Sequence, residues 1–276
     1  MTREECIARY HAEELRSRTG ATVTMLSKLK DAKYREEYGL YLAEGVKLAE
    51  EALAAVMDTE MLFVSEDGLQ NDRILVCLDA ANEKRIPIKL ASPEVFEKAA
   101  TEKAPQGIIA VLHRRKTERT FAEPDARYFL LDTIQDPGNL GTILRSAVAF
   151  GADGLILYGC VDPTGPKTVR ASMGALFRCP VQITKDLVKT VQQLQKDGHR
   201  VLAAALGENS LCAGQAELRK NDCVIIGNEG HGVSQEIIDL CDGVIRIPMQ
   251  AVTESLNASV AASVLLWEYY RTFGTK

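Results

Sequence analysis

Three clusters in the C-terminal half of the chain contain residue types that could do chemistry. Asn139 and Arg145 stand six residues apart. The glycine-rich stretch Gly227–Gly232 carries a glutamate in its middle. A third cluster runs from Ile247–Met249 to Ser255–Ser259. Three glycines in six residues let the backbone turn sharply, and they let another molecule lie against it without an intervening Cβ.

Each cluster also has a purely structural explanation. Asn139 could cap its helix, and Ser255 or Asn257 could cap the last helix of the chain. Arg145 could be a surface arginine with its stem along the helix, and the glycines could form a connection that binds nothing. Three such coincidences in one domain are less expected than one shared site, so we interpret the clusters together.

The neighbouring elements predict where these clusters lie. The apolar run 222–226 is typical of a buried strand, and the glycine loop follows it directly. A helical pattern over Gln235–Leu240 and a strand over Gly243–Ile247 come next. Together they indicate the rim of an open α/β sheet, where ligands bind outside the carboxyl ends of the strands.

The rest of this half predicts helix-linked parallel strands. Strands are expected at 128–132, 154–158, 181–184 and 200–206, and helices at 140–150, 167–177 and 186–196. Gln135–Asn139 is a turn by its chemistry. The last helix is expected over Leu256–Phe273, with Leu256, Val260, Val264, Trp267 and Tyr270 on one stripe.

The first half predicts a smaller α/β unit. A charged helix over 3–18 comes first, followed by a basic helix over 25–36 that contains Lys28, Lys30, Lys33 and Arg35. This basic stretch is a solvated helix face or a phosphate-contacting edge. Strands at 41–45, 61–65, 87–91 and 107–112 alternate with helices at 47–55, 71–83 and from Ser92. The charged stretch 113–127 is interpreted as a linker, with an RNA-facing patch as the alternative, so the predicted domains are 1–115 and 126–276.

Composition excludes several classes of protein. The chain has 276 residues, 46% of them hydrophobic and 26% charged, as in a soluble globular protein. No apolar run could span a membrane and the start is too polar for a signal peptide, so we expect a cytoplasmic location. Seven cysteines without a Cys-x-x-Cys pair and four histidines without ligand spacing predict no metal site. The net charge of −5 weighs mildly against a nucleic-acid partner, because local patches matter more than the total.

The combination of the three clusters resembles the motifs of the SpoU (TrmH-like) RNA ribose 2′-O-methyltransferases, in the family's order and at its spacing. The resemblance covers about residues 128 to 272. The first unit resembles the family's substrate-binding domain, which is similar to ribosomal protein L30e; Tyr41–Gly45 and Pro105–Ile108 are its signs. Residues 1 to about 20 look like an addition to this pattern.

The resemblance implies a fold and a cofactor. The fold would be a C-terminal α/β trefoil-knot (SPOUT) methyltransferase domain preceded by a smaller α/β L30e-like domain. The family binds S-adenosylmethionine in the knot as a homodimer. Carried over by position, the cofactor-binding residues would be Ala204, Leu206, Gly227, Asn228, Gly230, Ile247, Met249 and Leu256. Apolar residues flanked by glycine would suit an adenine ring.

The implied reaction is attack of a ribose 2′-hydroxyl on the sulfonium methyl group. In this family the arginine that matches Arg145 is the suggested base, but a guanidinium essentially never loses its proton in proteins. Binding the phosphate or the developing oxyanion is the more cautious role for Arg145. The other implied catalytic residues, which would orient the arginine, ribose and loop, are Asn139, Glu229, Ser255 and Asn257. Asn139 and Arg145 could act across the dimer interface.

Alternative functions follow from the same residues. The L30e-like domain weakly favours ribosomal RNA as the substrate over transfer RNA. A non-catalytic RNA-binding protein could keep the fold, although the complete set of polar motif residues argues against it. A nucleotide-dependent oxidoreductase is disfavoured, because no Gly-x-Gly-x-x-Gly opens a helix after the first strand. Dimerisation could align the basic stretches 28–35 and 114–119 and offset the acidic net charge.

Overall fold

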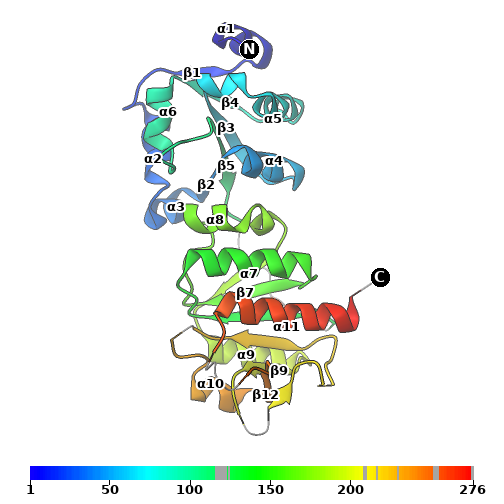
Figure 1. Cartoon of the computed structure of the whole chain (residues 1–276). Helices are drawn as coiled ribbons and strands as arrows, with labels where there is room; N and C mark the ends of the chain where they lie inside the picture. The colour runs from blue at the N-terminus through cyan, green and yellow to red at the C-terminus, as the bar shows by residue number, and fades with distance from the viewer. Residues whose placement is uncertain are drawn as a thin grey trace. The chain divides into compact units, whose positions relative to one another are not determined.

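The computed structural model describes residues 1–115, 123, 125–207, 210–215, 217–228, 230–250 and 255–274 (Figure 1). The chain forms two compact units. Unit 1 contains Met1–Arg115 together with Asp162–Phe177, and unit 2 contains Lys116–Val161 together with Arg178–Lys276. The short segment Asp162–Phe177 therefore packs with unit 1, although it lies within the predicted second domain; the predicted domain bounds stay a prediction.

Unit 1 is built on a five-stranded mixed sheet. Its strands are β1 (Glu13–Leu15), β2 (Leu40–Glu44), β3 (Thr59–Ser65), β4 (Ile88–Ala91) and β5 (Ile108–His113). Their order is β1-β4-β3-β5-β2. Strands β1 and β3 pair parallel with β4, whereas β5 runs antiparallel to β2 and β3.

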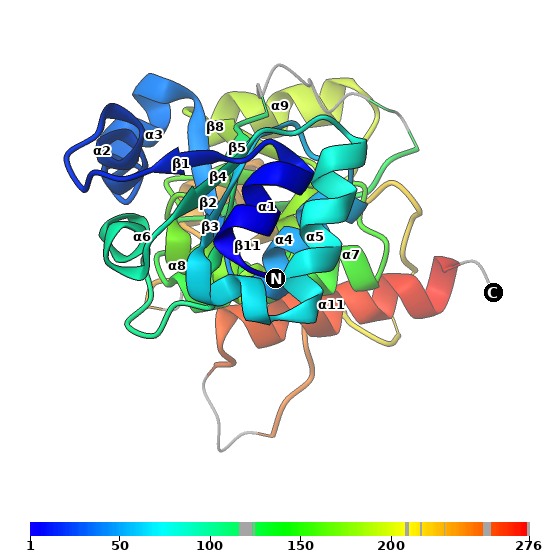
Figure 2. The same cartoon turned by 90° about the horizontal axis from the view of Figure 1, so that it is seen from above.

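Helices cover both faces of this sheet. They are α1 (Arg3–Tyr10), α2 (Ala21–Lys28), α3 (Ala32–Tyr38), α4 (Val46–Ala54), α5 (Asp72–Glu83), α6 (Pro93–Ala99) and α8 (Pro166–Ser172), with 3₁₀ turns η1 (Glu66–Gln70) and η2 (Ala175–Phe177). Helices α2 and α6 lie on one side of the sheet and α4 and α5 on the other (Figure 2). Phe63 of β3 stacks on Phe96 of α6 with ring centres 5.0 Å apart, inside the core beneath α2 and α6.

The N-terminal elements differ from the prediction in two places. The helix expected over 3–18 ends at Tyr10, where His11 adopts a left-handed conformation (φ 51°). The following residues form β1 and pair with β4 at Lys89–Ala91, a long-range partner that a local charge pattern does not show. The helix expected over 25–36 is broken into α2 and α3, because Asp31 caps α3 by accepting a hydrogen bond from the Lys33 amide at 3.0 Å.

A buried ion pair holds the segment Asp162–Phe177 within unit 1. The Arg35 guanidinium, 4% exposed, donates to the Asp162 carboxylate from Nε at 3.0 Å and from Nη2 at 2.7 Å. Its Nη1 donates to the carbonyl oxygens of Leu29 and Lys30 at 2.9 Å. The helix expected over 167–177 is the shorter α8, which ends at Met173 in a left-handed conformation and continues as η2.

Unit 2 is built on a seven-stranded sheet in which every strand pair is parallel. Its strands are β6 (Tyr128–Asp132), β7 (Gly154–Tyr158), β8 (Val181–Thr184), β9 (Val201–Ala204), β10 (Leu211–Cys212), β11 (Cys223–Ile226) and β12 (Gly243–Arg246). Their order is β10-β12-β9-β11-β6-β7-β8. The predicted parallel α/β sheet is thereby confirmed, and the glycine loop follows β11 as expected.

Among the described residues of unit 2, the helices that flank this sheet are α7 (Pro137–Ala149), α9 (Leu187–Lys196), α10 (Gln235–Leu240) and α11 (Ala258–Phe273). Helices α9 and α10 pack together on one face, and α7 and α11 pack together on the other. Figure 2 shows α9 on the opposite side of the sheet from α7 and α11. Helix α7 begins inside the expected turn Gln135–Asn139, because Asp136 caps it and Pro137 fits the first helical position. Asn139 is therefore not the cap.

Helix α11 is attached to the sheet through one face only. The Tyr269 hydroxyl donates to the fully buried Asp222 carboxylate at 2.9 Å, and Arg200 donates to the same carboxylate at 2.7 Å. Burial, followed by the neighbouring Asp222 charge, raises the pKa of Tyr269. The residues Ala262, Leu265 and Leu266 share this buried face.

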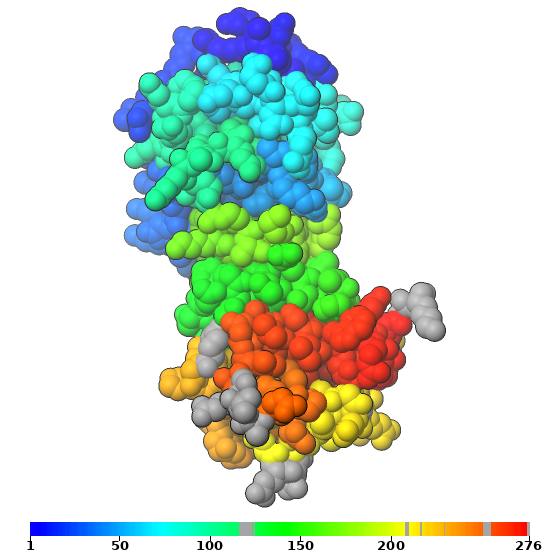
Figure 3. Space-filling view, in the orientation of Figure 1, coloured from blue at the N-terminus to red at the C-terminus, as the bar shows by residue number. Residues whose placement is uncertain are grey.

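Four of the five residues of the predicted apolar stripe lie on the opposite, exposed face of α11. Leu256 does not, because the helix begins at Ala258 after the Asn257 cap and Leu256 lines a pocket instead. Val260, Val264, Trp267 and Tyr270 remain between 36% and 47% exposed. Phe150, at the end of α7, packs against Trp267 and Tyr270 with ring centres 5.6 and 5.9 Å away. Figure 3 shows α11 (red) at the surface. Within the described parts of the chain, no helix combines the length and apolar character that crossing a membrane requires.

Candidate active site

The ends of β9, β11 and β12 and the start of α11 surround a pocket of about 440 Å³. It is lined mainly by apolar side chains and by the backbone of the glycine loop. All eight residues predicted to bind the cofactor line this pocket: Ala204, Leu206, Gly227, Asn228, Gly230, Ile247, Met249 and Leu256. Ser255, predicted to be catalytic, lines it as well. Their individual roles stay predictions.

Gly227 sits where no side chain could fit. A Cβ at this position would lie 2.1 Å from the carbonyl carbon of Gly232 and 2.3 Å from the Val233 nitrogen. The loop folds back on itself there, since the Gly232 amide donates to the Asn228 carbonyl at 2.8 Å. The glycine is therefore required for the close approach of two backbone segments at the pocket wall.

Asn228 holds the loop in this shape. Its Nδ2 donates to the Thr133 carbonyl at 2.9 Å, and its Oδ1 accepts from the Gly230 amide at 2.8 Å. The side-chain amide thus ties the loop to the end of β6 and fixes its turn. Asn228 therefore holds the loop in place at the pocket. The sequence pattern predicted Asn228 as a cofactor-binding residue and did not indicate this structural role.

Asn139 and Asn257 are brought together although 118 residues separate them. The Asn257 Nδ2 donates to the Asn139 Oδ1 at 3.1 Å. The Asn257 Oδ1 accepts from the Ser259 amide at 2.9 Å, so the same side chain caps α11. Nearby, the Ser146 and Ser263 hydroxyls lie 2.7 Å apart and link α7 to α11. The first and third motifs therefore meet at the starts of two paired helices.

Arg145 stands apart from this cluster. Its side chain is exposed, and no hydrogen bond or ion pair joins that side chain to another residue that the structure describes. Six positions at about 100° per residue turn its side chain roughly 240° around α7 from Asn139. Arg145 does not line the pocket of its own chain. Glu229, the remaining predicted catalytic residue, lies outside the described residues.

A second crevice of about 430 Å³ lies on the other side of the glycine loop, at the carboxyl ends of β6, β7 and β8. It shares Asn228, His231 and Gly232 with the first pocket. Asp132, at the end of β6, lines it and is 8% exposed. Burial raises the pKa of this carboxyl, against a smaller lowering by a hydrogen bond with Thr133. Asp132 was not among the site residues predicted from sequence. Its position, an acidic residue at the end of the first strand of a βαβ unit, could have indicated a place near a ligand site.

Comparison with known proteins identifies the class. Residues 126–267 match the SpoU rRNA Methylase family, and residues 21–110 match the MRM3-like substrate binding domain. The chain belongs to the SpoU family and is an S-adenosylmethionine-dependent RNA methyltransferase. This confirms the resemblance, the cofactor and the substrate-binding first unit that the motifs predicted.

Individual relatives cover nearly the whole chain. It is 33% identical over 251 residues to an uncharacterized tRNA/rRNA methyltransferase of Synechocystis sp., with 90% of each chain covered. It is 31% identical over 257 residues to the 23S rRNA (guanosine(2553)-2′-O)-methyltransferase RlmP of Bacillus subtilis, covering 92% of this chain and 98% of the relative. The crystal structure of the AdoMet-bound rRNA methyltransferase from Sinorhizobium meliloti is similar at a TM-score of 0.82 and 27% identity, covering 95% and 98%.

Proposed function

We propose that this chain transfers a methyl group from S-adenosylmethionine to a ribose 2′-hydroxyl of ribosomal RNA. The observation that supports this most is the convergence of three separate segments, the glycine loop, the end of β12 and the start of α11, on one apolar pocket. The near-complete coverage of RlmP, whose name states a 23S rRNA ribose as its target, favours ribosomal RNA. Transfer RNA is the second candidate, because the Synechocystis relative is named for both substrates.

The pocket fits the cofactor by its shape and chemistry. Its volume of about 440 Å³ and mostly apolar walls suit an adenine ring, and loop and strand-end backbone can supply donors and acceptors. Gly227 and Gly230 keep the backbone accessible, while Ile247, Met249 and Leu256 supply apolar contact. When bound there, S-adenosylmethionine supplies the methyl group.

Arg145 is proposed to act on the ribose oxygen through hydrogen bonds. Its guanidinium stays protonated, so it donates to the oxygen on which negative charge develops or to the adjacent phosphate. The Asn139–Asn257 pair is proposed to position the start of α7, and with it the arginine, relative to the pocket. Ser255 and Glu229 are proposed to orient the ribose and the loop.

We also propose a homodimer in which Arg145 serves the pocket of the partner. Arg145 does not line the pocket of its own chain, and α11 exposes the apolar stripe Val260, Val264, Trp267 and Tyr270. An exposed apolar patch of this kind marks an interaction surface. Burying it against a second copy would bring another Arg145 toward the site. A trefoil knot around the pocket and a cytoplasmic location complete the proposal.

Mixing two impaired variants tests the shared site, when transfer is assayed at a cofactor concentration that fills the wild-type pocket but not the Gly227→Ala pocket. Arg145→Ala keeps an intact pocket, and Gly227→Ala keeps an intact arginine. If Arg145 acts across the interface, refolding or co-expressing the two variants together restores transfer in the mixed dimer, which has one complete site. If Arg145 acts within its own chain, no mixed dimer has a complete site and the mixture stays inactive. Each variant mixed with itself is the control.

The substrate is tested by methyl transfer from labelled S-adenosylmethionine to RNA from a strain lacking the protein. The RNA is separated into ribosomal and transfer fractions and digested to nucleosides. A 2′-O-methylated nucleoside in the ribosomal fraction is the expected result. Label confined to the transfer RNA fraction would replace the proposed substrate, and label on a base would overturn the ribose assignment.

A further inference from the structure

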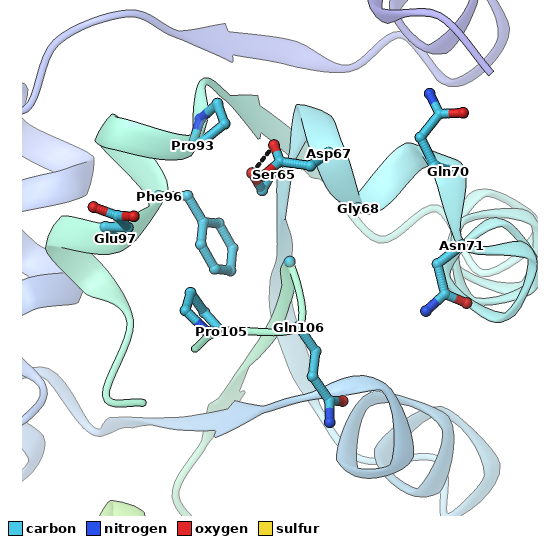
Figure 4. Close-up of a pocket in the computed structure, with 11 residues that line it drawn as sticks. Ser65, Asp67, Gly68, Gln70, Asn71, Pro93, Phe96, Glu97, Pro105 and Gln106 are labelled. Carbon is cyan, nitrogen blue, oxygen red and sulfur yellow. Dashed lines mark hydrogen bonds between the residues drawn. The ribbon is translucent and has the colours of Figure 1, made fainter. Parts of the chain in front are cut away.

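Unit 1 contains a pocket of its own, with a volume of about 400 Å³. It lies between the end of β3 with η1, the start of α6, and the loop that enters β5 (Figure 4). Every residue that lines it falls within residues 21–110, the part that matches a substrate binding domain. None of the residues predicted for the cofactor or for catalysis lines it.

The floor of this pocket is preformed by two backbone segments in contact. A Cβ on Gly68 would lie 2.8 Å from the Gly107 carbonyl oxygen, and a Cβ on Gly107 would lie 2.9 Å from the Gly68 Cα. Gly107 has a φ of +82°, which favours glycine, and its carbonyl accepts from the Ser65 amide at 2.9 Å. Next to it, the Gln106 Oε1 accepts from the Val46 amide at the start of α4 at 2.9 Å. The loop is thus pinned on both sides.

The walls combine apolar residues with polar side chains; Phe96 is 1% exposed and belongs to the core behind the wall, and the Gln70 Nε2 already donates to the Met1 carbonyl oxygen at 3.4 Å. Pro93, Phe96 and Pro105 lie on one side, and Gln70 and Asn71 lie on the other (Figure 4). Asn71 uses its Oδ1 to cap α5 by accepting from the Arg73 amide at 3.0 Å, which leaves its NH₂ group as a donor. Asp67 accepts from the Ser65 hydroxyl through one oxygen at 3.0 Å, which leaves the other as an acceptor.

The negative charge of the lining residues disfavours a phosphate as the ligand of this pocket. Asp67 and Glu97 line the pocket, and none of its described lining residues is a lysine, arginine or histidine. A phosphate would therefore be repelled, whereas an uncharged group with hydrogen-bond donors would be attracted. A flat apolar wall with a donor and a carboxylate on its rim is the environment in which proteins bind an unstacked nucleobase through its Watson–Crick edge.

We propose that this pocket binds an unpaired guanine of the substrate RNA. Guanine presents two adjacent N–H donors, N1–H and the N2 amino group, which match the free Asp67 carboxylate oxygen. Pro93 and Pro105 cover the ring. This assignment rests on the proposed function, because it requires RNA to be the substrate. It adds a nucleotide that is recognised in a different pocket from the one proposed to bind the cofactor.

The test compares Asp67→Asn with Glu83→Gln in the full chain. Asn replaces a carboxylate oxygen with a donor that opposes the guanine N–H groups, whereas Glu83 is an exposed acid at the end of α5 that does not line the pocket. With ribosomal RNA from a strain lacking the protein, the KM for RNA in Asp67→Asn is expected to rise about tenfold with kcat unchanged. Glu83→Gln is expected to match the wild type, and both variants should melt at the wild-type temperature.

Direct binding identifies the base. Guanosine, inosine and adenosine are titrated by calorimetry into the full chain with S-adenosylmethionine at saturation, so that the adenine site is filled. Guanosine is expected to bind about tenfold more tightly than inosine, which lacks the N2 amino group, and Asp67→Asn should lose this difference. Equal binding of the three nucleosides, or unchanged guanosine binding in Asp67→Asn, overturns the proposal. Absence of methyl transfer by the wild type overturns the proposed function instead, and the nucleoside titration still reports on the pocket.

Discussion

The pocket of unit 1 and the cofactor pocket of unit 2 share a backbone construction but differ in the chemistry of their walls. Gly227 in unit 2 and the Gly68–Gly107 pair in unit 1 both mark places where two backbone segments touch and no Cβ fits. Around Gly227 the walls are mainly apolar, whereas around Gly68 they carry carboxylates and amides. Glycine contact therefore sets the shape of each pocket, and the neighbouring side chains determine its ligand.

The largest effect is expected from a residue that belongs to neither pocket. Arg145→Ala should lower kcat for methyl transfer about a thousandfold, because it removes donors aimed at developing negative charge. The Kd for S-adenosylmethionine and the KM for RNA should stay near wild type, as calorimetry and steady-state kinetics can show. Loss of cofactor binding in this variant would mean that Arg145 supports the structure of the pocket. The proposal that Arg145 acts in methyl transfer but not in cofactor binding would then be wrong.

Glycine variants test the shared construction directly. Gly227→Ala forces a Cβ against the backbone of Gly232 and Val233, so the affinity for S-adenosylmethionine should fall about a hundredfold. Gly207→Ala, next to the pocket residue Leu206, meets nothing within 4 Å and is the matched control. Gly68→Ala should leave the cofactor Kd unchanged and raise the KM for RNA. A weaker cofactor affinity in Gly68→Ala would show that the pockets are not independent.

The unit 2 pocket could be predicted from sequence because its residues are recognisable by type and spacing. The glycine loop, Ile247–Met249 and Ser255–Leu256 are local signals, and the structure places residues of each around one cavity. The position of Arg145 relative to this cavity was not predictable, since six residues of helix set an angle but not the neighbour that the side chain meets. The link from Asn139 to Asn257 likewise depends on how α7 and α11 pair.

The unit 1 pocket had no comparable signal. Gly68 and Gly107 are 39 positions apart and ordinary turn residues in sequence, and only their contact shows why both are glycine. The same limit explains the errors in the fold. Residues 13–15 form β1 only because β4 is available as a partner, and the last-helix stripe was recognised without any sign that it would be exposed.

Removing the Arg35–Asp162 ion pair tests whether the stability of unit 1 can be lowered without a change in cofactor binding by unit 2. Burial would raise the pKa of Asp162, but hydrogen bonds from Thr164 and Arg35 outweigh it and hold the pKa below its usual range. Asp162→Asn leaves the buried Arg35 without its charge partner. The cost should be about 2 kcal/mol at neutral pH, below that of a fully buried pair because the Asp162 side chain is 23% exposed.

The pH dependence of this difference has a defined sign. A carboxyl with a lowered folded-state pKa contributes stability above its unfolded-state pKa, and that contribution is lost as the pH falls through the folded-state value. Denaturant unfolding of wild type and Asp162→Asn should therefore differ at pH 7 and converge in acid, below about pH 4. A gap that persists unchanged well below about pH 4 would mean that the Asp162 charge does not stabilise unit 1. Cofactor affinity, measured where both proteins are folded, should not change.

The smallest effect concerns the basic stretch of α2 and α3. Lys28 and Lys33 place their ammonium groups 5.0 and 5.6 Å from the centre of the Tyr34 ring, which itself stacks on Tyr38 at 6.1 Å. A phosphate-contacting edge predicts that Lys28→Gln with Lys33→Gln weakens RNA binding a few-fold at low salt, with the difference vanishing at high salt. A solvated helix face predicts no change at either salt concentration. The Kd for S-adenosylmethionine should be the same in both cases. A change in the Kd for RNA alone would mean that α2 and α3 contact RNA in addition to the pocket of unit 1. An unchanged Kd for RNA would leave that pocket as the proposed RNA contact of unit 1.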